Sequence, residues 1–298
     1  MPAPLPRFGG VYVASTTTFD EQGDLDLDAH TSHCRWLVES GVAGLVPCGS
    51  LGEYEALTDM ERIAVVEATV QAAGDAAVVP GVSGKSGAEA RRWAEHAGAA
   101  GAGAVMCLPP TSHAPTAEEV VAHFTEVARA GLPIVVYNNP FSTRVDLTPA
   151  LLARVADEVP LVTAVKEFSQ DVRRVAAIRE TAPRLEVLCG CDDVFVESML
   201  MGATGWIAGF VNAIPAETVA MYQLCVDGQW DDAVATYRQM LPMLRYDALP
   251  TFVQAIKAAQ EEAGRPGGPV RLPRLPLAPD VDKHVRQATR DFLLAAGR

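Results

Sequence analysis

Hydrophobic positions occur along most of the chain as short apolar runs that alternate with longer amphipathic runs. This alternation is typical of repeated βα units around a parallel sheet. The apolar runs that we predict as strands are residues 11–15, 44–48, 77–82, 104–108, 133–137, 161–166, 186–189 and 205–208. The pattern therefore predicts eight strands, each followed by an amphipathic segment.

Polar residues with capping chemistry mark where the intervening helices are expected to begin. Thr58, Ser86 and Thr116 are each followed three residues later by Glu, which is the spacing of a capping box. Thr148 stands before Pro149, a residue favoured at the first helical position, and Ser169 is a further expected start. The glycines expected to end the preceding helices are Gly41, Gly74, Gly98 and Gly131.

The uninterrupted rhythm favours a closed (β/α)8 barrel over a doubly wound sheet, because nothing marks a reversal of strand order. No GxGxxG motif follows the first strand, so the sequence lacks the motif that best indicates a dinucleotide-binding fold. After about residue 213 the pattern becomes helical, over 216–226, 230–243, 251–263 and 282–296, with a proline-rich connector at 266–279. We predict one domain, a barrel over residues 1–228 with a helical extension over 229–298 packed on it.

Composition and charge narrow the function. Hydrophobic residues make up 49% and charged residues 20%, an ordinary globular balance. The formal net charge is −13 without a Lys/Arg cluster, which argues against nucleic-acid and anionic-membrane partners. A site for an anionic small molecule must therefore create its own positive potential from backbone amides or a particular cation.

The remaining bulk features suggest a cytoplasmic protein. No apolar run reaches the roughly 18 residues of a membrane span, and the N-terminus shows no secretory signal. The cysteines have no CxxC spacing and stand in apolar contexts, so we expect buried free thiols rather than a metal or redox site. They are Cys34, Cys48, Cys107, Cys189, Cys191 and Cys225.

In a (β/α)8 barrel the active site forms at the carboxyl ends of the strands, so polar residues there are candidates. The first such place is the glycine-flanked turn VPCGSLGE, residues 46–53. Gly49 would let the chain turn so that the amides of Ser50 and Leu51, and the Ser50 hydroxyl, face a carboxylate. A purely steric role for such a turn is the simpler interpretation when it is taken alone.

Two further candidates close neighbouring strands, Tyr137 in IVVYNNP and Lys166 in VTAVKEFS. A lysine ending an apolar barrel strand is partly desolvated, which lowers its pKa and favours the nucleophilic amine. Taken singly, Lys166 could instead extend to the rim and pair with Glu167, and Tyr137 could be a packed aromatic. Residues at equivalent ends of adjacent parallel strands face one cavity. The presence of both Lys166 and Tyr137 there favours a catalytic role over a structural one.

The motifs GSLGE, YNNP, KEFS and GCDD, in this order, resemble the dihydrodipicolinate synthase and N-acetylneuraminate lyase family of Schiff-base aldolases and lyases. The resemblance covers nearly the whole chain. It implies that Lys166 forms the Schiff base and Tyr137 shuttles protons. It also implies a homotetramer and no metal or other cofactor. The substrate-binding residues that it implies are Gly49, Ser50, Leu51, Gly190 and Ile207.

Departures from the synthase pattern limit the specific activity. Leu51 replaces the second threonine of the synthase motif, and Ser112 falls where the synthase relay has a further tyrosine. Ser142 replaces an arginine, although Arg144 stands two positions on and is a candidate for the pocket. Lysine-pathway synthase activity is therefore in question, and sialic acid cleavage also loses support because Leu51 has no hydroxyl.

The stretches KEFSQDVRRV, GCDDVFVESMLMGATGWIAGF, VQAIKAAQ and VRLPRLPL look most like bacterial 1-pyrroline-4-hydroxy-2-carboxylate deaminases of hydroxyproline breakdown. We therefore expect a lyase or deaminase acting on a small 2-oxo or 2-imino acid. The alternatives are a pyruvate-dependent aldolase or 4-hydroxy-tetrahydrodipicolinate synthase-like enzyme, a sensor that binds a small acid without turnover, and a metal-dependent barrel enzyme.

Other polar residues have simpler interpretations. His113, on the loop after the fourth strand, could act at the mouth, but an exposed loop histidine is the plainer interpretation. Asp192 and Asp193 are expected to cap the next helix rather than bind a metal. Met199, Met201 and Trp206 are expected in the core.

Overall fold

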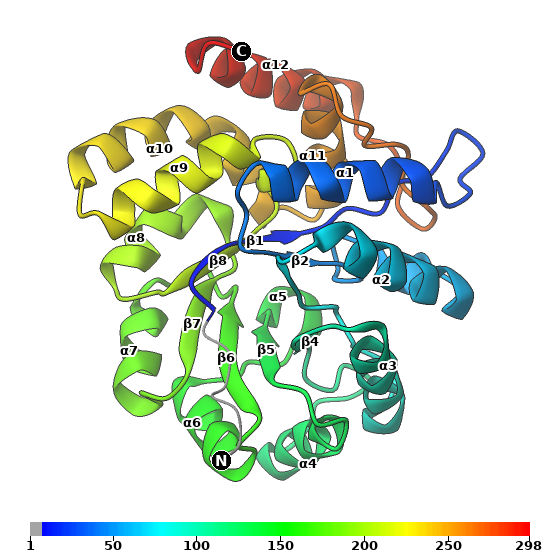
Figure 1. Cartoon of the computed structure of the whole chain (residues 1–298). Helices are drawn as coiled ribbons and strands as arrows, with labels where there is room; N and C mark the ends of the chain where they lie inside the picture. Colours follow the sequence, from blue (N-terminus) through cyan, green and yellow to red (C-terminus); the bar gives the residue numbers. More distant parts are fainter. Residues whose placement is uncertain (1–7) are drawn as a thin grey trace.

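The computed structural model describes residues 8–298, and its centre is one sheet of parallel strands curled into a barrel (Figure 1). The strands are hydrogen-bonded in the order β3, β2, β1, β8, β7, β6, β5, β4. The ring closes where Gly81 and Met106 form an isolated parallel bridge. The predicted (β/α)8 barrel is therefore confirmed. The strands are β1 (Gly10–Ala14), β2 (Gly44–Val46), β3 (Ala77–Val78), β4 (Val105–Cys107), β5 (Ile134–Asn138), β6 (Val162–Glu167), β7 (Glu186–Cys189) and β8 (Gly205–Ala208).

The main difference from the predicted strands lies in β3, which ends at Val78 instead of residue 82. Pro80 has no N–H and cannot continue the ladder. The chain still follows the edge of the sheet, because Met106 N donates to Pro80 O at 2.9 Å and Val82 N donates to Met106 O at 2.8 Å.

Helices surround the barrel and begin largely where capping residues predict. Thr58 and Thr116 form complete capping boxes, and the Ser86 and Thr148 side chains each accept from the third residue of their helix. The helices are α1 (Leu27–Glu39), α2 (Asp59–Ala73), α3 (Gly87–Ala100), α4 (Ala117–Ala128), α5 (Pro140–Thr143), α6 (Pro149–Glu158), α7 (Arg173–Thr181), α8 (Phe195–Leu200), α9 (Pro215–Val226), α10 (Trp230–Leu244), α11 (Phe252–Glu262) and α12 (Pro279–Ala295), with short 3-10 segments η1 (Tyr54–Ala56), η2 (Asp192–Val194), η3 (Phe210–Asn212) and η4 (Arg245–Ala248).

Two of the predicted cap residues do not mark a helix boundary, and the last helix begins at Pro279 instead of residue 282. Gly98 lies inside α3, which continues to Ala100 and is capped by Gly101 at φ 104°. A Cβ on Gly98 would lie 3.3 Å from Leu132 Cδ1, so this glycine serves close packing. Helix α7 starts at Arg173 rather than near Ser169, because Gln170 has a left-handed backbone with φ 62°, which a right-handed helix cannot contain.

The helices after β8 pack on one another and on the barrel. In Figure 1, α9 and α10 lie side by side, and α11 and α12 pack against each other on the same side of the molecule. Between α11 and α12 the chain forms the predicted connector without helix or strand. Within residues 8–298, no helix combines the length and apolar character needed to cross a membrane.

The core confirms two further expectations and corrects one. All six cysteines are free and buried. Trp206 is fully buried and stacks on Phe195, with ring centroids 3.9 Å apart. Met201, in contrast, is 42% exposed, because it follows the last turn of α8 on the outside of the barrel.

Candidate active site

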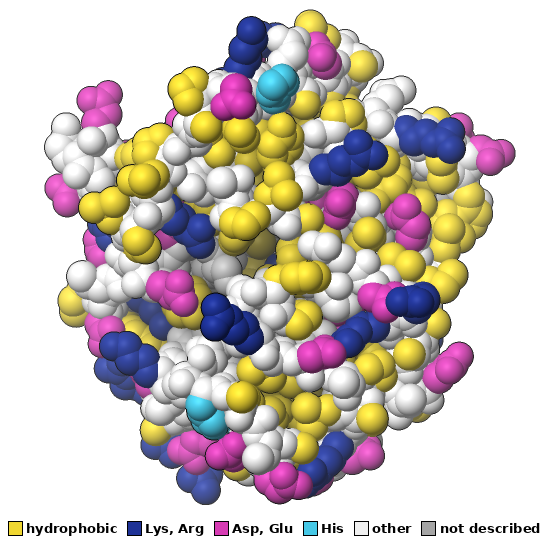
Figure 2. All heavy atoms as spheres, turned by 180° about the vertical axis from the view of Figure 1, so that it is seen from behind, with side chains coloured by type: hydrophobic (Ala, Val, Ile, Leu, Met, Phe, Trp, Pro, Cys, Tyr) yellow, Lys and Arg dark blue, Asp and Glu magenta, His cyan; other side chains and the backbone are white. Residues whose placement is uncertain are grey.

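A cavity of about 530 Å³ lies at the carboxyl ends of the strands. Figure 2 shows this face of the molecule hollowed near its centre, with hydrophobic and basic side chains around the hollow. The residues that line the cavity are Ala14, Val46, Gly49, Ser50, Leu51, Gly52, Met106, Tyr137, Asn139, Phe141, Ser142, Lys166, Phe168, Gln170, Gly209, Asp247, Ala248, Leu249, Pro250, Phe252 and Arg274. Its wall is therefore mainly apolar, with a few polar groups.

Lys166 and Tyr137 stand beside each other in this cavity. They are register partners on β6 and β5, and the Lys166 Nζ lies 4.5 Å from the centre of the Tyr137 ring. The ring of Phe168 is also near, at 5.9 Å from the same nitrogen. Burial lowers the pKa of Lys166 below its ordinary value, while the charges of Asp247 and Asp192 act in the opposite direction. Deprotonation of Lys166 to the neutral amine is therefore easier than deprotonation of a lysine on the surface.

The phenol of Tyr137 has one fixed partner. Asn139 Nδ2 donates to the Tyr137 hydroxyl oxygen at 2.9 Å, which leaves the phenolic hydrogen free to point into the cavity. Burial raises the pKa of Tyr137 above its ordinary value. A phenol in this setting holds its proton and can hand it to a neighbouring group and recover it.

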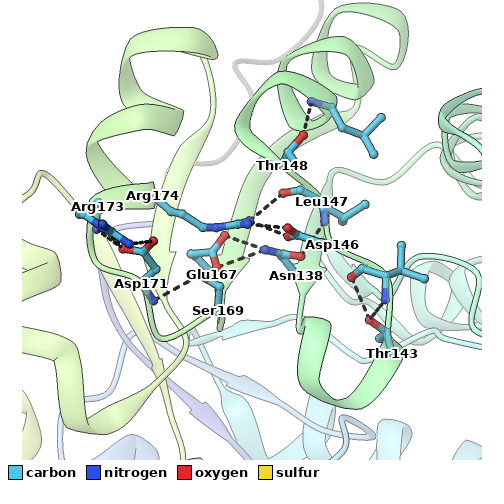
Figure 3. Close-up of polar contacts among 12 residues, drawn as sticks. Asn138, Thr143, Asp146, Leu147, Thr148, Glu167, Ser169, Asp171, Arg173 and Arg174 are labelled. Carbon is cyan, nitrogen blue, oxygen red and sulfur yellow. Dashed lines mark hydrogen bonds and ion pairs between the residues drawn. The ribbon is translucent and has the colours of Figure 1, made fainter.

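A buried polar network outside the cavity fixes the ends of β5 and β6, as Figure 3 shows. Asn138 Nδ2 donates to both oxygens of Glu167, at 3.1 and 2.9 Å, and Ser169 N donates to Glu167 Oε1 at 2.7 Å. The Asn138 Oδ1 accepts from Leu147 N at 3.0 Å. Successive strand residues point to opposite sides. This network therefore keeps the ends of β5 and β6 in register while Tyr137 and Lys166 face the cavity. Glu167 is bound within the network and is not the ion-pair partner of Lys166.

The turn after β2 brings backbone amides to the cavity wall. Gly49, Ser50 and Leu51 all line the cavity, and within the described chain neither the Ser50 nor the Leu51 amide donates to another protein group. The turn is fixed at its two sides by left-handed residues, Cys48 at φ 57° and Glu53 at φ 52°. Free amides beside a buried lysine form a suitable site for a carboxylate.

Glu53 anchors this turn to the C-terminal part of the chain. Its Oε1 lies 2.8 Å from the Nζ of Lys257 on α11, and both side chains are almost fully buried. Its Oε2 accepts from Arg271 N at 3.0 Å, and Lys257 Nζ also donates to Pro269 O at 2.7 Å. The proline-rich connector is therefore tied directly to the turn that carries Ser50.

The other predicted site residues lie at different distances from the cavity. Gly190 gives Lys166 its room, because a Cβ there would lie 2.9 Å from Lys166 Cε. Ile207 is buried in β8 and is not among the lining residues. Arg144 is exposed at the end of α5, with φ 58°, and does not line the cavity. His113 is exposed and lies 3.4 Å from Glu119.

The expectation that Asp192 caps a helix is wrong, because its carboxylate is fully buried and used elsewhere. It accepts from Trp206 Nε1 at 3.0 Å, from Gly209 N at 3.1 Å and from Phe210 N at 2.8 Å. Burial raises its pKa to about 6, although these hydrogen bonds oppose the shift. Within residues 8–298 no cluster of His, Cys, Asp or Glu side chains is arranged to hold a metal ion.

Three of the lining residues that were not predicted from the sequence carry functional groups of interest: Asn139, Asp247 and Arg274. Asn139 could have been found, since it belongs to the YNNP motif and follows Tyr137 closely. Asp247, in η4, and Arg274, in the proline-rich connector, come from segments without a chemical motif. Arg274 stacks over the Phe252 ring at 5.4 Å and is the only arginine among the lining residues. It is a local cation in an acidic protein.

Comparisons with known proteins identify the family of this chain. A family model described as the dihydrodipicolinate synthetase family matches residues 7–291. The 4-hydroxy-tetrahydrodipicolinate synthase of Methanothrix thermoacetophila is 34% identical over 282 residues, 94% of this chain and 95% of that protein. The corresponding protein of Methanocaldococcus jannaschii is 30% identical over 96% of this chain and 99% of its own length.

Solved structures of the same group superpose closely on the chain. The 4-hydroxy-tetrahydrodipicolinate synthase of Methylacidiphilum fumariolicum has a TM-score of 0.93 at 25% identity, covering 98% of this chain and 99% of that one. YagE, a prophage protein of E. coli whose structure holds pyruvate, has a TM-score of 0.91 at 28% identity, covering 97% and 100%. The chain therefore belongs to the dihydrodipicolinate synthetase family, whose members are lyases that act through a Schiff base without a cofactor.

Proposed function

We propose that Lys166 forms a Schiff base with C2 of a small 2-oxo or 2-imino acid, and that Tyr137 moves protons on the bound substrate. The observation that carries this proposal is the buried amine of Lys166 in one cavity with the Tyr137 phenol, 4.5 Å from its ring. The free amides of Ser50 and Leu51 offer a place for the substrate carboxylate. Such an iminium withdraws electrons from C3, and the phenol carries the resulting proton transfers.

We propose 1-pyrroline-4-hydroxy-2-carboxylate as the substrate. The Lys166 amine adds to C2, the bond from C2 to the ring nitrogen breaks, and that nitrogen takes up a proton. Loss of a C3 proton then expels the 4-hydroxyl as one water and leaves a double bond between C3 and C4. Proton transfers from C5 to C3 and from the amine nitrogen to C4 convert this alkene into an imine at C5. Two waters hydrolyse the C5 imine and the Lys166 iminium. Overall, one water is consumed, and ammonia and a 2-oxo acid semialdehyde are released.

The nearest alternative is a pyruvate-dependent aldolase or a 4-hydroxy-tetrahydrodipicolinate synthase, the activity named for the curated relatives. Three positions count against the synthase. Leu51 presents hydrocarbon to the cavity, Ser142 presents no cation there, and Ser112 is exposed on its loop. Positions 51, 142 and 112 therefore lack the hydroxyl, the arginine and the phenol of the synthase pattern, and the arginine of this wall is Arg274 instead.

A sensor without turnover has less support. Binding of a small acid needs neither a desolvated amine nor a phenol with a free hydrogen, and the cavity contains both. From its family resemblance, we also expect the chain to act as a homo-oligomer.

The test is reductive trapping followed by product analysis. The protein is incubated with pyruvate or with the pyrroline, reduced with borohydride, and examined by intact and peptide mass. We expect one adduct, on Lys166, and faster release of ammonia from the pyrroline than condensation of pyruvate with aspartate semialdehyde. Comparable or faster condensation would replace the deaminase with the synthase. An adduct on another lysine, or none, would overturn the Schiff-base assignment.

A further inference from the structure

Asp247 brings a carboxyl group into the cavity from outside the barrel strands. It lies in η4, is 6% exposed, and lines the same cavity as Lys166 and Tyr137. Its Oδ2 accepts from Asp192 N at 3.1 Å. Its Oδ1 lies against Gly209, where a Cβ would come within 2.7 Å. Any side chain at Gly209 would therefore displace the carboxyl group.

Asp247 and Asp192 have different surroundings although they are neighbours. The Asp192 carboxylate accepts hydrogen bonds from the indole of Trp206 and from two backbone amides, and it does not line the cavity. Asp247 has one such bond and faces the cavity. Asp192 is therefore held as an acceptor, whereas one oxygen of Asp247 stays available to a ligand.

Burial shifts both Asp247 and Lys166 towards their neutral forms. Burial, and then the nearby charge of Asp192, raise the pKa of Asp247 well above its ordinary value, while the charge of Lys166 acts in the opposite direction. Burial lowers the pKa of Lys166 in the same cavity. A neutral acid next to a neutral amine is the combination that Schiff-base formation requires.

We propose that Asp247 is the general acid that protonates the leaving group when Lys166 forms its iminium. The amine of Lys166 adds to C2 of a 2-oxo acid, and the carbinolamine C–O bond breaks as Asp247 gives its proton to the departing oxygen. An amine, a ketone and a carboxylic acid become an iminium, a water and a carboxylate. With a cyclic imine the same proton goes to the ring nitrogen.

This role, which depends on the Schiff base of the proposed function, also explains how the chain manages without the synthase hydroxyls. Leu51 has none, and Ser112 is exposed outside the cavity. After the proton leaves, the Asp247 carboxylate becomes the counter-ion of the iminium in a largely apolar cavity. A buried cation without such a partner would be costly.

The test measures the rate of iminium formation with pyruvate by rapid mixing and borohydride quench. We expect Asp247→Asn to form the adduct roughly 10²- to 10⁴-fold more slowly, the usual size of a general-acid contribution. The amide oxygen of that variant can still accept from Asp192 N. Formate should partly restore the rate of Asp247→Ala, a result that a merely structural role would not give. Asp193→Asn is the matched control, because it removes a nearby charge that does not line the cavity, and its rate should stay within about threefold.

The pH dependence of the rate of iminium formation supplies a second measurement. The acid form of Asp247 is required, so the rate should fall as pH rises through its raised pKa, and this limb should vanish in Asp247→Asn. The titratable groups around Asp247 are Lys166 and Tyr137 on the cavity wall, Cys189 at the end of β7, and Cys191, Asp192 and Asp193 before α8.

The outcomes separate this proposal from the function itself. A rate for Asp247→Asn within threefold of the unmodified protein, or a profile without the falling limb, would overturn the role of Asp247. If the adduct forms with an Asp247-dependent rate while the pyrroline is not consumed, the role of Asp247 holds and the deaminase assignment fails.

Discussion

Lys166 and Tyr137 share one cavity but carry different parts of the proposed chemistry. The amine makes the covalent bond, while the phenol, held by Asn139 at 2.9 Å, moves protons afterwards. We predict that Lys166→Ala gives no borohydride-trapped adduct. Tyr137→Phe should still form the adduct but turn over roughly 10²- to 10⁴-fold more slowly. Intact mass after reduction, together with steady-state ammonia release, distinguishes the two variants. Normal turnover by Tyr137→Phe would remove the phenol from the mechanism.

These two residues could be predicted from the sequence because each ends an apolar strand within a recognisable motif. Asp247 could not, since it follows a helix in a stretch without a motif and reaches Lys166 only through the packing of the C-terminal segment. Arg144 was a candidate on spacing alone. Its left-handed backbone at the end of α5 leaves it exposed, and Arg274 lines the cavity instead.

At the level of elements, the alignment of β5 and β6 depends on the buried pair of Asn138 and Glu167. We predict that Asn138→Asp destabilises the fold by roughly 1–3 kcal/mol at pH 7.5, because two buried acceptors then face each other without a donor. One of the two carboxyls must hold a proton, so its folded-state pKa is raised above its unfolded value. The destabilisation should therefore shrink as pH falls towards 5. Thermal unfolding at both pH values measures it.

The matched control is Gln223→Glu. Gln223 also donates to a carboxylate, Asp227 Oδ1 at 2.8 Å, but both residues are exposed. A like-charged surface pair of this spacing should cost only about 0.2–0.5 kcal/mol. Equal losses in the two variants would show that the buried network contributes no more than a surface contact.

The strands themselves could be predicted well, because the apolar runs of a parallel barrel are short, continuous and separated by capped helices. The errors lie where tertiary contacts overrule a local signal. Ser169 has the chemistry of a helix cap, but the next residue, Gln170, has a left-handed backbone and the helix begins only at Arg173. Gly98 resembles a helix end, yet it sits within α3 to admit Leu132.

For the whole molecule, the ion pair between Glu53 and Lys257 joins the barrel to its last helices. Both side chains are almost fully buried, 2.8 Å apart. We predict that Lys257→Met lowers the free energy of unfolding by roughly 3–5 kcal/mol, because it leaves a buried carboxylate without a cation. The double variant Glu53→Gln, Lys257→Met should recover much of that loss. Denaturant unfolding of Lys257→Met, Glu53→Gln and the double variant gives the coupling energy between the two residues. Additive losses of stability would contradict a stabilising ion pair.

The dependence of the site on the last part of the chain has a consequence for synthesis. All eight strands, with Lys166 and Tyr137, leave the ribosome before Asp247, Lys257 and Arg274 do. A nascent chain can thus close its barrel while it lacks the proposed acid, the partner of Glu53 and the cation at the mouth. The newborn enzyme is expected to be silent until its C-terminal helices have folded back. Proteolytic trimming of those helices should end activity and also destabilise the barrel, because α11 and α12 share one apolar core with β1 and β8.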